Sequence, residues 1–105
     1  MNSVEKGDQS EAYVTHILKK KGYVHVIRSL GSLTPIDIIA SNGAEILAVQ
    51  VKQRNYLTSK SGADLIEWAA KFNATPYLAY KSHRRWVITP YTDGPKTGTS
   101  RTIPF

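Results

Sequence analysis

The chain has 105 residues, 41% of them hydrophobic, which is enough for one domain around one core, and we treat residues 1–105 as that domain. Fourteen Lys and Arg against eight Asp and Glu leave a net charge of +6, and this surplus favours a polyanion partner such as nucleic acid. The absence of cysteine excludes disulfides and Cys-ligated zinc. No apolar run approaches the roughly 18 residues of a membrane span. We therefore expect a cytoplasmic protein outside the membrane.

The first half of the chain predicts one helix and three strands. Helical periodicity predicts a helix over residues 5–21, with Gly22 as its stop. Alternating apolar residues predict a strand over 23–28, and Pro35 precedes a second strand over 36–40. A third strand covers residues 45–52.

The second and third strands are joined by Ser41-Asn42-Gly43. Because Asn-Gly accepts positive φ values at little cost, this triplet predicts a tight type I′ hairpin. The two strands then lie side by side and antiparallel.

The second half predicts a polar loop over residues 53–62, a helix from Leu65 to about Asn73, and strands over 75–80 and 85–89. Residues 91–105 have no readable period and are expected to form a flexible or dimer-contacting tail. The resulting order, α-β-β-β-α-β-β, predicts an α/β fold in which a mixed sheet of about five strands is flanked by helices.

Three polar side chains interrupt the apolar strands of the predicted hairpin. Gln50 and Lys52 share one face by the two-residue period of a strand, and the hairpin brings Asp37 alongside. A carboxylate and an amide oxygen can hold Mg²⁺ beside a phosphate, and an ammonium can stabilise developing negative charge. Each of the three taken singly also suits a solvated strand end.

The spacing of these residues resembles a known nuclease signature. Asp37, twelve residues and then Gln50-Val51-Lys52 is similar to the PD-(D/E)XK motif. A longer ordered set resembles the archaeal Holliday junction resolvase family over residues 6–90. It comprises Lys6-Gly7-Asp8-Gln9-Ser10-Glu11, Gly22-Tyr23, Arg28-Ser29-Leu30-Gly31-Ser32 and Asp37-Ile38-Ile39-Ala40.

The resemblance implies a restriction-endonuclease-like fold and a homodimer that cleaves four-way DNA junctions in recombination and repair, with Mg²⁺ or Mn²⁺. It also implies that Glu11, Asp37 and Gln50 bind the metal, assisted by the Val51 carbonyl. Lys52 would be the catalytic lysine, and Ser32 would act near the phosphate. The residues expected to contact DNA are Lys6, Arg28, Ser32, Arg54, Lys60, Arg84 and Arg85.

Gln50 departs from the family pattern, which has Glu at this position. An amide oxygen is an uncharged and weaker ligand, and Glu45 cannot replace it because an odd offset puts it on the opposite face. Two alternatives therefore stay open, an Mrr-like or restriction-type endonuclease for duplex DNA and a catalytically silent DNA-binding module. Trp68 and Phe72, at helical spacing, are interpreted as core residues or a dimer face.

Overall fold

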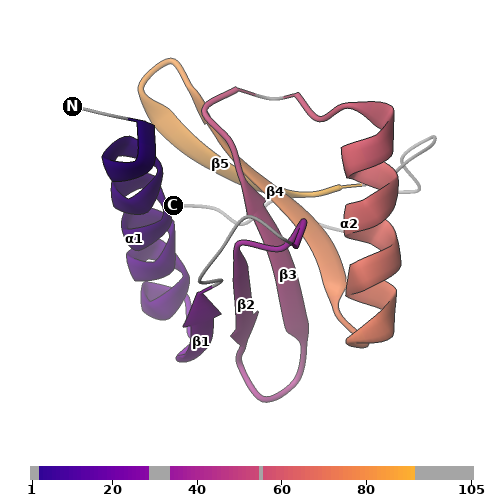
Figure 1. Cartoon of the computed structure of the whole chain (residues 1–105). Helices are drawn as coiled ribbons and strands as arrows, with labels where there is room; N and C mark the ends of the chain where they lie inside the picture. The colour runs from indigo at the N-terminus through magenta and orange to yellow at the C-terminus, as the bar shows by residue number, and fades with distance from the viewer. Residues whose placement is uncertain (1–2, 29–33, 55, 92–105) are drawn as a thin grey trace.

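The computed structural model describes residues 3–28, 34–54 and 56–91, with side chains from residue 9 onward. One five-stranded sheet lies between two helices, α1 on one face and α2 on the other (Figure 1). The strand order in the sheet is β1-β2-β3-β4-β5, and the order of elements along the chain is the one predicted. The α/β class and the mixed sheet are therefore confirmed.

Helix α1 spans Ser3–Lys20 and covers one face of the sheet. Its buried side chains include Val14 and Leu18, both without solvent exposure. Lys19 and Lys20 lie in the last turn, where positive charge interacts favourably with the helix dipole. Gly22 then takes a φ of 99°, which glycine adopts without steric cost, and the chain turns into β1 (His25–Arg28).

Strands β2 (Ile38–Ser41) and β3 (Ile46–Val51) form the predicted antiparallel pair, with Ile38 opposite Val49. The predicted type I′ turn between them is wrong. Gly43 has a positive φ of 92°, whereas Asn42 is absent from the residues with positive φ. The Asn42 side chain instead accepts hydrogen bonds from the backbone N–H groups of Ala44 and Glu45, both at 2.8 Å. Asparagine side chains compete for backbone donors in this way, and the connection is a four-residue loop.

Helix α2 spans Ser59–Lys71 and begins earlier than predicted, inside the segment expected to be a loop. Thr58 is its N-cap, and its side chain accepts a hydrogen bond from Ser61 N at 3.1 Å. Such a cap satisfies one of the otherwise unpaired N–H groups of the first turn. Asn73 follows the helix with a φ of 54°, the left-handed conformation that commonly ends a helix.

Strands β4 (Thr75–Ser82) and β5 (Arg85–Pro90) complete the sheet. Because α2 carries the chain across the sheet, β4 runs parallel to β3, whereas β5 pairs with β4 antiparallel. Two apolar clusters result. The one on the α1 face contains Leu18, Val49 and Trp86, and the one on the α2 face contains Ala48 and Leu65.

The part of the chain described in the structure contains no helix that combines the length and the apolar character of a membrane span. Apart from Tyr91, the predicted tail lies outside the described residues.

Candidate active site

Asp37 lies at the entrance to β2, one residue before the strand and not within it as predicted. Its backbone N–H donates to Val49 O at 2.9 Å, which continues the pairing with β3. Its Oδ2 accepts hydrogen bonds from Val51 N at 2.8 Å and from Gln50 Nε2 at 3.0 Å. The structure therefore brings Asp37, Gln50 and Val51 together at the end of the β2–β3 hairpin.

The two faces of β3 separate Gln50 from Glu45. Ala48 belongs to the α2-face cluster, and strand alternation puts Gln50 on that same face. Glu45 lies on the other side, where its carboxylate accepts a hydrogen bond from the Tyr23 hydroxyl. Burial and this hydrogen bond raise the pKa of Tyr23 to about 12. The prediction that Glu45 lies on the opposite face of the strand from Gln50 is therefore confirmed.

The Asp37 carboxyl is half-buried, and burial is the main cause that raises its pKa above the ordinary value. The Val51 N–H and the positive charge of Lys52 act in the opposite direction and lower it. Desolvation disfavours an ionised carboxyl, whereas hydrogen bonds and nearby cations favour it. A carboxylate that is partly desolvated and only partly compensated is one whose charge a bound cation would stabilise.

Lys52 and Gln53 follow β3 directly. The backbone N–H of Lys52 donates to Ala79 O at 2.8 Å, which anchors its backbone to β4 while its side chain is exposed. Gln53 Nε2 donates to Ser10 Oγ at 2.7 Å, so the segment after the site is fastened to α1. Sequence reasoning missed Gln53, since a contact across 43 residues leaves no periodic signal.

Glu11 lies on α1 and its carboxylate forms an ion pair with Arg28 at the end of β1, with Oε1 and Nη2 3.6 Å apart. Both side chains are partly buried, at 23% and 33% exposure. The metal-binding role predicted for Glu11 and the DNA contact predicted for Arg28 stay predictions. The ion pair shows that the two groups are close enough to influence each other.

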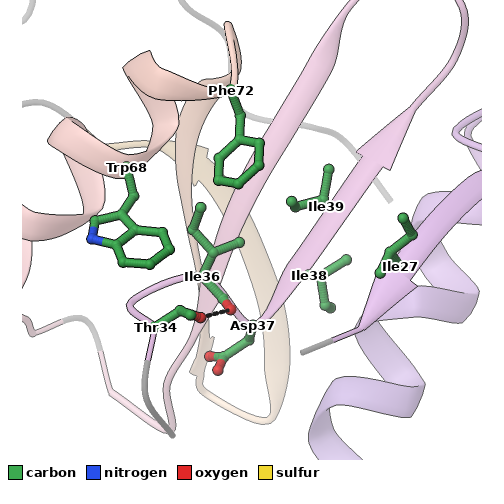
Figure 2. Close-up of a pocket in the computed structure, with 8 residues that line it drawn as sticks. All are labelled: Ile27, Thr34, Ile36, Asp37, Ile38, Ile39, Trp68 and Phe72. Atoms are coloured by element: carbon green, nitrogen blue, oxygen red, sulfur yellow. Dashed lines mark hydrogen bonds between the residues drawn. The ribbon is translucent and has the colours of Figure 1, made fainter. Parts of the chain in front are cut away.

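An apolar pocket of about 170 Å³ adjoins Asp37 on the α2 side. Figure 2 shows Trp68 of α2 and Phe72, the residue that caps its C-terminus, projecting toward Ile36 and Ile39. Thr34 and Asp37 are the polar residues among its eight lining side chains, and Thr34 Oγ1 donates to Ile36 O at 2.9 Å. That hydrogen bond, which sequence reasoning also missed, supports the turn that presents Asp37.

The other residues predicted to contact DNA are distributed over the surface. Arg54 follows β3, Lys60 lies in the first turn of α2, and Arg84 and Arg85 lie at the β4–β5 hairpin, all exposed. Ser32 lies outside the described residues, and of Lys6 only the helical backbone is described. These assignments stay predictions.

The donors around Asp37 suit a hard divalent cation. Among the described residues, no three His, Cys, Asp or Glu side chains gather as a metal-binding group. The oxygens available are those of the Asp37 carboxylate, the Gln50 amide and the Val51 carbonyl. Mg²⁺ commonly keeps several waters and uses one or two carboxylates together with substrate phosphates. A small set of oxygen donors such as this one is compatible with Mg²⁺ binding of that kind.

A mixed sheet flanked by helices, with Asp before one strand and Gln-Val-Lys at the end of its neighbour, is the arrangement expected of a restriction-endonuclease-like nuclease. The comparisons with known proteins narrow this class. The family described as archaeal Holliday junction resolvase (hjc) matches residues 2–102. The chain belongs to this family of metal-dependent DNA endonucleases.

A curated protein and a solved structure, both from Archaeoglobus fulgidus, agree with this assignment. A protein named crossover junction endodeoxyribonuclease Hjc is 35% identical over an alignment 94 residues long, and the match covers 81% of this chain and 68% of the relative. The solved structure of A. fulgidus Hjc, described as a Holliday junction resolvase from an archaeal hyperthermophile, superposes with a TM-score of 0.72 at 31% identity. That match covers 91% of this chain and 86% of the other.

The raised pKa of Asp37 predicts a pH-dependent effect of Asp37→Asn on stability. The pKa of this carboxyl is higher in the folded state than in the unfolded state. Its contribution to stability is therefore fully present below about pH 3.8 and is lost as the pH rises through the folded-state pKa. In metal-free buffer, Asp37→Asn should therefore melt at a higher temperature than the unaltered protein near pH 7. The difference should vanish at acid pH. Thermal melts across this range test it, and a lower melting temperature for Asp37→Asn at pH 7 would contradict it.

Proposed function

We propose that this chain resolves four-way DNA junctions by hydrolysing phosphodiester bonds at the Asp37 edge of the sheet. The observation that carries the proposal is the contact of the Asp37 carboxylate with both Gln50 and Val51, next to the exposed Lys52. Family membership supports junction DNA as the substrate. The same membership argues against the two alternatives, a nuclease for linear duplexes and a silent binding module.

The proposed cofactor is Mg²⁺, or Mn²⁺ in its place. Asp37, the Gln50 amide oxygen and the Val51 carbonyl would hold it, with Glu11 contributing from α1. When bound, such a cation polarises the phosphoryl group and lowers the pKa of a coordinated water. Because Gln50 now donates its Nε2 to Asp37, its side-chain amide has to rotate to present the oxygen.

Lys52 has a separate role in this proposal. Its backbone N–H donates to Ala79 on β4. The exposed side chain is therefore attached to a main chain that is held in place beside Asp37. A cation held there stabilises the negative charge that develops on the phosphate during hydrolysis. Arg28, Arg54 and Lys60 would hold the flanking phosphates, which fixes the register of DNA on the protein.

The proposed assembly is a homodimer. Ile27, Trp68 and Phe72 are 69%, 38% and 47% exposed and line the same pocket beside Asp37. The two aromatic rings are stacked with centroids 6.5 Å apart. Exposed apolar patches of this kind mark interaction surfaces. A two-fold axis near the patch would use one surface twice and would supply one site for each of two symmetric cuts.

The first experiment compares cleavage of a four-way junction, a linear duplex and a single strand in Mg²⁺. We expect preferential cleavage of the junction, and we expect Asp37→Ala and Lys52→Ala each to lower the rate by about a hundredfold or more, since each removes transition-state stabilisation. Lys71→Ala, an exposed lysine at the far end of α2, is the charge control. Cleavage by Asp37→Ala at the unaltered rate would refute the site assignment.

The second experiment restores the carboxylate that the family pattern has at Gln50. A unit charge about 4 Å from an ion contributes about 1 kcal/mol in water and more where the site is partly buried. We therefore expect Gln50→Glu to bind Mg²⁺ or Mn²⁺ roughly tenfold more tightly and to melt at a lower temperature without metal. Isothermal titration calorimetry and thermal melts measure both.

The matched control for Gln50→Glu is Asn73→Asp, which adds the same charge just after the C-terminal end of α2. Equal metal affinity in Gln50→Glu and the unaltered protein would mean that residue 50 is not a ligand.

The third experiment tests the dimer. Truncating the Trp68 and Phe72 side chains removes apolar area from the proposed interface, and a double Ala variant should be monomeric at concentrations where the unaltered protein is dimeric. Light scattering after gel filtration measures the mass. Tyr56→Ala, at a residue 68% exposed and outside the pocket lining, should stay dimeric. A dimeric double variant would place the interface elsewhere.

A further inference from the structure

A second groove lies on the α1 face of the molecule, away from the pocket beside Asp37. It runs between α1 and the β4–β5 hairpin and has a volume of about 660 Å³. The lining residues are Tyr13, His16, Ile17, Lys20, Lys21, Arg84, Arg85 and Trp86. It shares no residue with the Asp37 pocket, so it is a separate site.

All the charged residues that line this groove are positive. Lys20 and Lys21 contribute two cations from the end of α1, and Arg84 and Arg85 contribute two from the hairpin, all exposed. No carboxylate is among the lining residues. Clustered cations without neighbouring anions attract polyanions, and phosphate contacts of this kind supply affinity that depends on salt.

The hairpin tip holds its basic residues in an unusual backbone conformation. Ser82 pairs with Arg85, which leaves His83 and Arg84 as a two-residue turn with φ values of 50° and 68°. Residues that carry a side chain adopt left-handed conformations at an energetic cost, and such turns usually contain Gly or Asn. This defined turn conformation fixes the direction in which the Arg84 side chain projects from the backbone.

Two aromatic residues, Tyr13 and Trp86, also line the groove. Trp86 is only 8% exposed and belongs to the core cluster beneath α1, whereas Tyr13 is 55% exposed on the helix. The exposed Tyr13 ring can contact the apolar edges of sugars while the cations bind phosphates. This combination fits a nucleic-acid backbone better than a small anion, which would need a single convergent cluster.

We propose that this groove binds the sugar–phosphate backbone of a DNA arm outside the region that is cut. Lys20 and Lys21 bind phosphates from one side, and Arg84 and Arg85 bind them from the other. The groove lies on the face of the sheet opposite Gln50, so it reaches DNA that the Asp37 edge does not. The inference rests on the proposed junction-resolving function for the source of that DNA.

The test uses fluorescently labelled four-way junction and linear duplex in EDTA, where binding is measured without cleavage. Lys20→Gln/Lys21→Gln and Arg84→Gln/Arg85→Gln are compared with Lys71→Gln, a single charge removed from α2. Each lost phosphate contact lowers the slope of log affinity against log salt by about 0.9. We expect each double variant to lower the slope for the junction by about 2 and to weaken binding at least tenfold at low salt. Lys71→Gln should change neither quantity.

A second measurement locates the DNA directly. Since the chain has no cysteine, His16→Cys supplies a unique thiol in the groove for attachment of an iron–EDTA reagent, which cuts nearby DNA by hydroxyl radicals. Cuts on a junction arm away from the site of hydrolysis support the proposal. Lys71→Cys carries the same reagent on the other face and should not reproduce those cuts.

Unchanged affinity and salt slope in both double variants, or cuts no different from those of the Lys71→Cys protein, would overturn the groove assignment. Either result would leave junction cleavage by the unaltered protein intact. Conversely, absence of junction cleavage in Mg²⁺ would refute the proposed function, while the binding measurements would still report on the groove. The two failures are therefore distinguishable. Melting temperatures near that of the unaltered protein establish that the variants are folded.

Discussion

The organisation of this molecule depends on how one carboxylate is held. Asp37 Oδ2 takes a backbone N–H from Val51 and a side-chain N–H from Gln50, and these contacts join the entrance of β2 to the exit of β3. Burial makes the charge costly, as the raised pKa shows, and the two donors offset part of that cost. The carboxylate is thereby fixed at the one edge where Lys52 also leaves the sheet.

The sheet then separates two kinds of surface. On the α2 face, the pocket beside Asp37 is bordered by exposed Trp68 and Phe72, which suits association with another protein surface. On the α1 face, the hydrogen bond between Ser10 and Gln53 and the ion pair between Glu11 and Arg28 hold the first half of α1 against the strand ends. Beyond these contacts, α1 and the β4–β5 hairpin border a groove rimmed by cations. The exposed apolar patch and the basic groove thus lie on different sides of one fold.

Features that depend on neighbouring residues in the sequence could be predicted from it. Strand alternation placed Gln50 and Glu45 on opposite faces, and hairpin pairing brought Asp37 to Gln50, because both follow from the backbone period and a short connection. The start of α2 was missed because the cap at Thr58 lies outside the apolar periodicity used to find the helix. The turn at Asn42 was misassigned because its side chain captures backbone donors that the turn pattern ignores. The pairing of Glu11 with Arg28 depends on how α1 packs, which a pattern along one chain does not encode.

The amide at residue 50 has a consequence for the order of events on DNA. Two neighbouring carboxylates would repel each other in the absence of metal, whereas Gln50 donates a hydrogen bond to Asp37 and so partly stabilises its charge. In the proposed ligand set, the β2–β3 hairpin supplies one full negative charge, so a cation there would gain part of its binding from the phosphate of the substrate. Binding of metal and of DNA would then be thermodynamically coupled, and each would strengthen the other by the same factor. A nuclease of this kind would carry its metal mainly when it is bound to DNA.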